Sequence, residues 1–317
     1  MTQHEQHPAV DLSVTIAGIH LKNPVMAASG TCGYGEELAA FLDINALGAI
    51  VTKGISLSPA AGNPPPRIVE TPSGMLNAIG LQNVGVEEFV AHKLPFLRQS
   101  QTPVIVNCFG KSVSEYCALC QKLSAVEGIA GLEINISCPN VKEGGMCFGT
   151  DPSRAHQLIR EVRKATALPI IVKLSPNVTD IALIARSVEE AGADAVSLTN
   201  TFTGMVIDVE TCQPVLANIT GGLSGPAIRP LSLRMVWETV HAVSVPVIGM
   251  GGIMDGADAL QYLIAGARAV QVGTALFVRP DAPLRIVKDI AAYLQKRGFR
   301  SVRDITGCLK VPGEQGR

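Results

Sequence analysis

Polar and glycine residues end a series of short apolar runs along this 317-residue chain. They are Ser29, Lys53, Asn107, Asn135, Lys173, Asn200, and the pairs Gly251–Gly252 and Gly273–Thr274. Buried amides and ammonium groups cost free energy unless they are hydrogen-bonded or paired. One or two of them can be explained as caps of neighbouring helices, but the whole set predicts a binding site for a polar ligand.

Two of these glycine-containing segments suggest phosphate binding. Gly251–Gly252 lies in the segment GMGGI, and Gly273–Thr274 lies in VGTA. Glycine lets backbone N–H groups approach a phosphate closely. By itself the pattern leaves FMN, a nucleotide and a sugar phosphate open as ligands, and also the interpretation that these are only tight turns.

One cysteine stands among the polar residues. Cys138 lies in the segment NISCPN, directly after one of the apolar runs. Pro139 restricts the backbone conformation immediately after this cysteine. Neighbouring lysines would favour a thiolate, which is the form that abstracts a proton. The competing interpretation is a buried apolar cysteine, the commonest fate of a free thiol. Residues 141–148 (VKEGGMCF) contain the Gly-Gly pair of a mobile loop, so we expect a lid over this base.

The lysine of the segment PIIVKLS is expected to point inward, because Lys173 alternates with apolar neighbours. A cation in that place would stabilise negative charge on a reduced flavin. Asn107 and Asn135 offer hydrogen bonds to the polar edge of a flavin ring.

The elements that carry these residues are eight short apolar runs, each followed by a helical pattern. The runs are 24–30, 49–54, 103–110, 131–137, 169–175, 195–201, 246–252 and 269–275. Nearly continuous apolar runs are typical of parallel strands buried on both faces. Eight such units predict an α/β fold, a closed (β/α)₈ (TIM) barrel, with the whole chain 1–317 as a single catalytic domain.

The clearest helical pattern spans residues 176–192. We expect Thr179 to be its N-cap and Gly192 to lie at its end. Its apolar stripe consists of Ile181, Leu183, Ile184 and Val188.

Three segments interrupt the repeat. Residues 12–23 alternate around Gly18 and predict an N-terminal hairpin before the first barrel strand. Residues 56–85 and 202–226 are long inserts after the second and sixth strands. Because they follow strands, we expect both inserts on the C-terminal face of the barrel, where active sites of this fold lie.

Composition excludes several other classes of protein. With 26 Lys+Arg and 27 Asp+Glu the net charge is −1, so there is no basic field for nucleic acid. No apolar stretch approaches the roughly 20 residues of a membrane span, and residues 1–10 do not resemble a signal peptide. The eight cysteines are expected to be free thiols, and the histidines show no metal-ligand spacing. We therefore expect a soluble, cytoplasmic protein without a metal site.

Several longer motifs resemble those of the dihydroorotate dehydrogenases. They are 73–83 (SGMLNAIGLQN), 135–145 (NISCPNVKEGG), 172–179 (VKLSPNVT), 217–226 (ANITGGLSGP) and 248–253 (IGMGGI). The resemblance runs from residue 12 to about residue 277 and is strongest to class 1B, the NAD-linked form. Class 2 enzymes have a serine base and an N-terminal membrane-binding extension, whereas this chain has Cys138 and no such extension. Class 1A, which uses fumarate, shares the cysteine, but NAIGL with the following Gln82–Asn83 looks more like class 1B.

The resemblance implies a set of roles for residues of this chain. Cys138 would take the C5 proton of (S)-dihydroorotate while hydride passes from C6 to FMN, which yields orotate for pyrimidine biosynthesis. The implied FMN-binding residues are Ser29, Lys53, Gly54, Asn107, Asn135, Lys173, Thr199, Gly225, Gly251, Gly252, Gly273 and Thr274. The implied substrate-binding residues are Lys53, Asn77, Ala78, Ile79, Gly80, Leu81, Asn135, Asn140, Asn200 and Thr201.

The resemblance also implies a partner. A class 1B catalytic subunit passes electrons to NAD⁺ through a second subunit with FAD and a [2Fe–2S] cluster, and the expected assembly is a homodimer of this chain within a heterotetramer. This sequence has neither a dinucleotide fingerprint nor a ferredoxin-type cysteine cluster. The alternatives are a class 1A enzyme, an FMN barrel like that of dihydropyrimidine dehydrogenase, and a non-redox phosphate-binding barrel such as an aldolase or isomerase.

Overall fold

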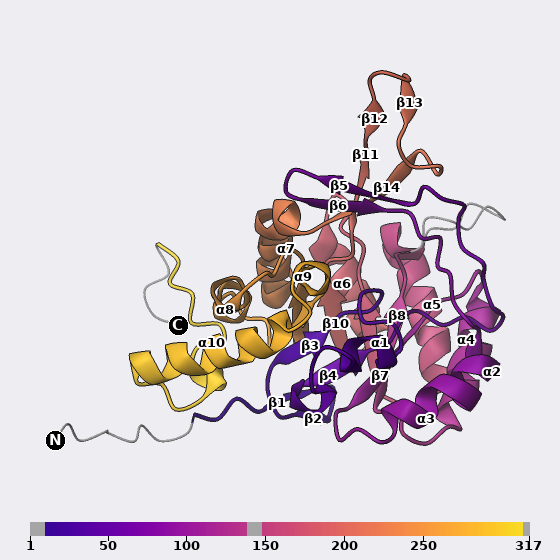
Figure 1. Ribbon diagram of the computed structural model, residues 1–317. Coiled ribbons are helices and arrows are strands. Elements are labelled where there is room, and N and C mark those ends of the chain that lie inside the picture. Colours follow the sequence, from indigo (N-terminus) through magenta and orange to yellow (C-terminus); the bar gives the residue numbers. More distant parts are fainter. Residues whose placement is uncertain (1–9, 138–147, 313–317) are drawn as a thin grey trace.

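A closed barrel of eight parallel strands forms the centre of the molecule (Figure 1). The computed structural model describes residues 10–137 and 148–312. Around the barrel the strand order is β10-β15-β16-β3-β4-β7-β8-β9. These strands are β3 (Val25–Ala27), β4 (Ala49–Val51), β7 (Val104–Cys108), β8 (Gly131–Asn135), β9 (Ile170–Lys173), β10 (Ala195–Leu198), β15 (Val247–Met250) and β16 (Ala269–Val272). The predicted (β/α)₈ barrel is confirmed, and each strand lies within its predicted run.

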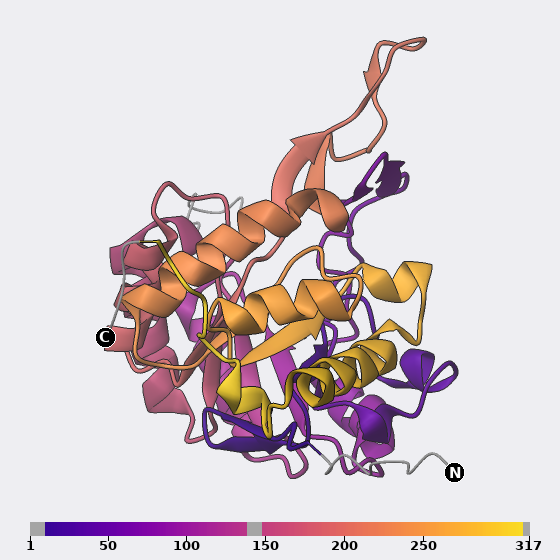
Figure 2. The same cartoon turned by 90° about the vertical axis from the view of Figure 1, so that its left-hand side faces the viewer.

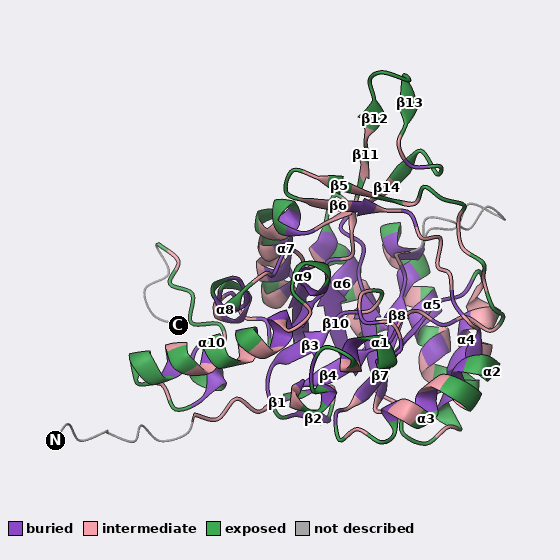
Figure 3. Ribbon diagram, viewed as in Figure 1, coloured by how far each residue is buried: buried purple, intermediate pink, exposed green. Residues whose placement is uncertain are grey.

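Helices surround the barrel and bury its strands (Figure 3). They are α1 (Glu36–Ala39), α2 (Val86–Glu88), α3 (Leu94–Leu97), α4 (Val113–Ser124), α5 (Pro152–Ala165), α6 (Ile181–Glu190), α7 (Arg229–Ala242), α8 (Gly256–Ile264), α9 (Ala275–Val278) and α10 (Ala282–Arg297). No helix in the described ranges is both long and apolar enough to cross a membrane.

Helix α6 departs from its prediction in two respects. Its N-cap is Asp180, whose carboxylate accepts a hydrogen bond from the backbone N–H of Leu183, so the prediction of Thr179 is wrong by one residue. Leu183 itself is 46% exposed and lies outside the buried stripe, which includes Ala185 instead. Gly192 lies just past the helix with a φ of 101°, a conformation that favours glycine.

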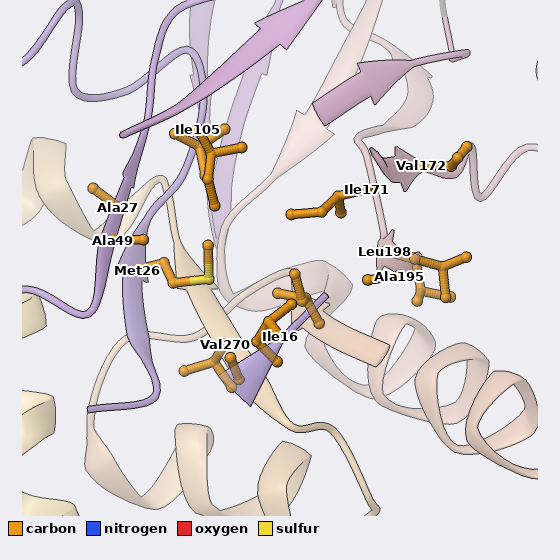
Figure 4. Packing of buried hydrophobic residues seen from close by; sticks show 14 of the residues in the cluster. Ile16, Met26, Ala27, Ala49, Ile105, Ile171, Val172, Ala195, Leu198 and Val270 are labelled. Atoms are coloured by element: carbon orange, nitrogen blue, oxygen red, sulfur yellow. The ribbon is translucent and has the colours of Figure 1, made fainter. Parts of the chain in front are cut away.

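The predicted N-terminal hairpin is confirmed as β1 (Val14–Ile16) paired antiparallel with β2 (Ile19–Leu21). Its apolar side chains belong to the barrel core. In Figure 4, Ile16 lies beside Met26 and Val270, which come from two neighbouring barrel strands. The hairpin thus packs against the apolar interior of the barrel.

The two long inserts meet in one antiparallel sheet, of order β11-β14-β6-β5. Strands β5 (Ile68–Thr71) and β6 (Gly74–Asn77) come from the first insert, and β11 (Phe202–Met205) and β14 (Thr220–Ser224) come from the second. We call these four strands the cover sheet. Figure 1 shows it over one end of the barrel, and a small hairpin, β12 (Ile207–Asp208) with β13 (Gln213–Pro214), projects beyond it (Figures 1 and 2).

Candidate active site

A cavity of about 540 Å³ lies at the carboxyl ends of the barrel strands and is also lined by the cover sheet. This volume is within the usual range for small-molecule sites, roughly 300–1,000 Å³. All predicted site residues among the described ones line this cavity. They are Ser29, Lys53, Gly54, Asn77, Ala78, Ile79, Gly80, Leu81, Asn107, Asn135, Lys173, Thr199, Asn200, Thr201, Gly225, Gly251, Gly252, Gly273 and Thr274.

A buried carboxylate lies beneath the cavity. Glu133, in the middle of β8, has no exposed surface. Its Oε1 accepts a hydrogen bond from Asn107 Nδ2 at 2.7 Å. Its Oε2 accepts hydrogen bonds from Gln271 Nε2 at 2.7 Å and from Ser197 Oγ at 2.9 Å. Side chains from three other strands, β7, β10 and β16, therefore converge on Glu133.

The inward orientation predicted for Lys173 is confirmed. The residue lies at the end of β9, lines the cavity, and is 6% exposed. Its Nζ lies 3.7 Å from Glu133 Oε1, so this buried cation has a carboxylate as its charge partner. The three hydrogen bonds that Glu133 accepts stabilise its carboxylate as the charge partner of Lys173, and buried charges are tolerated when they are paired in this way.

Glycines allow close packing at the side of the cavity near β15 and β16. Gly225, Gly251 and Gly252 have φ values of 96°, 121° and 68°, which side chains rarely adopt. A Cβ on Gly251 would lie 2.3 Å from Ser232 Oγ, and one on Gly225 would lie 2.7 Å from the Cα of Gly74. Only glycine fits at these positions without a shift of the neighbouring chain.

Asparagines from the barrel and from the cover sheet face the same cavity. Asn200 Nδ2 donates to Asn135 Oδ1 at 3.4 Å, and Asn200 Oδ1 accepts the backbone N–H of Thr201 at 2.8 Å. Asn77 Nδ2, on β6, donates to the carbonyl of Gly222 on β14 at 3.3 Å. The hydrogen bonds fix these amide groups around a polar space.

Two cationic side chains from outside the barrel strands also line the cavity. Burial lowers the pKa of Lys53, and the nearby Arg67 guanidinium lowers it further, while Glu37 opposes the shift. Arg67 donates through Nη2 to Gln82 Oε1 at 2.6 Å and through Nη1 to the carbonyl of Asn63 at 3.3 Å. Neighbouring positive groups of this kind favour an anionic ligand.

Three residues of this region were not among the predicted site residues: Glu133, Gln271 and Arg67. A charged or amide side chain within the otherwise apolar strands β8 and β16 was a usable signal for the first two, because such residues are rarely buried without a partner. Arg67 stands alone in a long insert, where no local pattern distinguishes it from a surface arginine.

The predicted catalytic base and one predicted ligand residue, Cys138 and Asn140, lie outside the described residues, as does most of the predicted lid at 141–148. Ser137, immediately before them, lines the cavity. The roles of Cys138 and Asn140 therefore stay predictions.

Comparison with known proteins agrees with this geometry. The family model described as dihydroorotate dehydrogenase matches residues 11–294. The chain belongs to the dihydroorotate dehydrogenase family. It is 57% identical to a protein of Citrifermentans bemidjiense and 58% identical to proteins of Geotalea daltonii and Geobacter metallireducens, in each case over 95% of this chain and 99% of the relative. Each of these relatives is named dihydroorotate dehydrogenase B (NAD(+)), catalytic subunit.

Membership of the dihydroorotate dehydrogenase family confirms the predicted resemblance and the predicted enzyme class, an oxidoreductase. It rules out the alternative of a non-redox aldolase or isomerase.

Proposed function

We propose that this chain oxidises (S)-dihydroorotate to orotate in pyrimidine biosynthesis, with one FMN per chain and with residues 1–317 acting as one catalytic domain. The observation that carries the proposal is the single cavity that gathers every described residue of the predicted cofactor and substrate sets. Those residues come from all eight barrel strand ends and both inserts. A chance arrangement would scatter them.

The polar groups around the cavity fit FMN. Gln271 Oε1 is buried without a hydrogen-bond partner among the described residues, although the residue lines the cavity. An orphaned acceptor calls for a donor, and the flavin ring carries an N–H group on its polar edge. Lys173, Asn107 and Asn135 would hold that edge, and the glycines near β15 and β16 would admit the phosphate. FMN, when bound, supplies the acceptor for the two electrons that leave the substrate.

The substrate would lie between this site and the cover sheet. Dihydroorotate carries a carboxylate, and Lys53 offers a cation to it from the cavity wall. Asn77, Asn135 and Asn200 offer amide hydrogen bonds to the ring, together with residues 78–81, Thr201 and Asn140. By enclosing the ring, the cover sheet would exclude water from the reacting atoms.

Cys138 would remove the C5 proton of dihydroorotate. The test is anaerobic mixing of the purified chain with dihydroorotate while the flavin absorbance is followed. The wild type should bleach, and Cys138→Ala should keep FMN but bleach far more slowly, because a positioned base contributes on the order of 10²–10⁴ in rate. A purified chain that holds no FMN, or that bleaches with dihydrouracil but not with dihydroorotate, would contradict the proposal.

Electrons would leave through a partner. The relatives are named as NAD(+) enzymes and as catalytic subunits, which supports a separate electron-transfer subunit. We assign it FAD and a [2Fe–2S] cluster, within a heterotetramer built on a homodimer of this chain. NADH formation should appear only when that subunit is added, whereas turnover with fumarate alone would indicate class 1A. All six cysteines that the structure describes are free thiols, which is in keeping with the cytoplasm.

A further inference from the structure

The buried carboxylate of Glu133 controls which atoms face the cavity. Its partners are all donors: two amide NH₂ groups, one hydroxyl and one ammonium. An ionised carboxylate only accepts hydrogen bonds. Asn107 and Gln271 must therefore turn their nitrogens toward Glu133, because the reverse orientation would set oxygen against oxygen.

This orientation has a consequence on the opposite side of each amide. With the nitrogen bound to Glu133, the amide oxygen points elsewhere, and both residues line the cavity. Gln271 Oε1 is buried without a partner in the described part of the chain. Asn107 Oδ1 lies 3.0 Å from where a Cβ on Gly54 would be, and Gly54 also lines the cavity. The floor of the cavity thus includes two residues whose amide oxygens are turned away from Glu133.

We propose that Glu133 is a positioning residue for the cofactor. By binding the amide nitrogens of Asn107 and Gln271, it leaves their oxygens as hydrogen-bond acceptors, so that Gln271 recognises the N–H of the flavin's pyrimidine ring. It also supplies the counter-charge that keeps Lys173 within the barrel, 3.7 Å away. This inference rests on the proposed function, because it assumes that the cavity holds FMN.

The decisive variant is Glu133→Gln, which keeps the volume but adds an NH₂ group. That NH₂ faces donors, so the amide of Asn107 or Gln271 must turn and present its own NH₂ to the cavity. The measurement is the affinity of the FMN-free full-length chain for FMN and for N3-methyl-FMN, by fluorescence titration. The wild type should prefer FMN, and we expect Glu133→Gln to weaken FMN binding about tenfold, which is typical of an unsatisfied buried donor or acceptor.

The ratio of the two affinities separates positioning from a merely structural role. Glu133→Gln keeps the side-chain volume, so any steric exclusion of the N3-methyl group is the same in the variant as in the wild type. A smaller preference for FMN over N3-methyl-FMN in Glu133→Gln therefore reports the loss of the hydrogen-bond acceptor. The double variant Glu133→Gln/Gln271→Glu restores an acceptor at position 271 and should recover much of the ratio. Ser197→Ala removes one hydrogen bond to Glu133 but does not require Asn107 or Gln271 to reverse its amide group. This variant should keep the wild-type ratio of the two affinities.

The outcomes are distinct. If Glu133→Gln folds and keeps the wild-type ratio, the inference is wrong even though FMN binding and bleaching by dihydroorotate still stand. If Glu133→Gln does not fold, Gln271→Met tests the same acceptor without touching the carboxylate, and an unchanged ratio there also overturns the inference. If the wild-type chain binds neither flavin, the proposed function fails and the inference fails with it.

Discussion

The cover sheet has a small apolar core of its own, which makes its stability separable from that of the barrel. Leu76 on β6 is 2% exposed and packs with Ala78 and Leu216 in a cluster distinct from the main core. Its cross-strand neighbours are Val69 and Leu223, one on each side. We predict that Leu76→Ala loosens the cover sheet while the barrel stays folded.

The size of the effect follows from burial. A buried Leu→Ala change costs about 2.7–5 kcal/mol, and the lower figure applies where only a few side chains form the cluster. About 2.7 kcal/mol is roughly a hundredfold change in the opening equilibrium, since 1.4 kcal/mol is tenfold. Local opening of this kind is read out by amide hydrogen exchange. Exchange in β5, β6 and β14 should be up to about a hundredfold faster, and the KM for dihydroorotate should rise because residues 77–81 follow Leu76.

A matched control is Leu119→Ala in α4, where the leucine is fully buried in the main core. It should lower the free energy of global unfolding in denaturant titration and leave amide exchange in the cover sheet at its wild-type rate. Equal acceleration of exchange in the barrel strands of Leu76→Ala, or exchange in β6 at its wild-type rate, would contradict the prediction.

Three further results are expected. Gly251→Ala should weaken FMN binding at least tenfold in a fluorescence titration, because its Cβ would collide with Ser232 Oγ at 2.3 Å; unaltered affinity would show that the glycine is not needed. Lys53→Met should raise the Tm of the FMN-free chain while abolishing dihydroorotate binding. Burial lowers the pKa of Lys53 in the folded chain below its ordinary value of 10.5. The charged ammonium therefore destabilises the folded chain. This destabilisation is fully present at pH values below the folded pKa and disappears as the pH rises through the pKa of the unfolded chain. The Tm gain should therefore shrink in alkaline buffer, and a gain that grew with pH would contradict this. Burial raises the pKa of Cys32 to about 12, so mass-spectrometric maleimide mapping at pH 8 should label exposed Cys212 and Cys308 long before Cys32.

The barrel was predictable because its signals are local. Each strand is a short apolar run, and the register of Lys173 against its apolar neighbours indicates which way its side chain points. The ends of helices are harder to predict from sequence than the strands. Thr179 and Asp180 are both favourable N-cap residues, and only the backbone path decides that Asp180 accepts the N–H of Leu183.

The cover sheet could not be predicted in the same way. Its strands were expected only as long inserts, and they pair residues such as Asn77 and Gly222, which lie 145 positions from each other. Such pairing depends on how the barrel brings the two inserts together, and no pattern within either insert encodes it.

The sequence by itself determined the barrel, its polar strand ends and the family to which they belong, because apolar periodicity and motif spacing are properties of neighbouring residues. Tertiary structure alone decided that Asn107, Ser197 and Gln271 converge on Glu133, across separations of up to 138 residues. The physical reason is closure of the barrel. Only a closed sheet brings side chains of β7, β8, β10 and β16 to one point, where a buried carboxylate must find its donors.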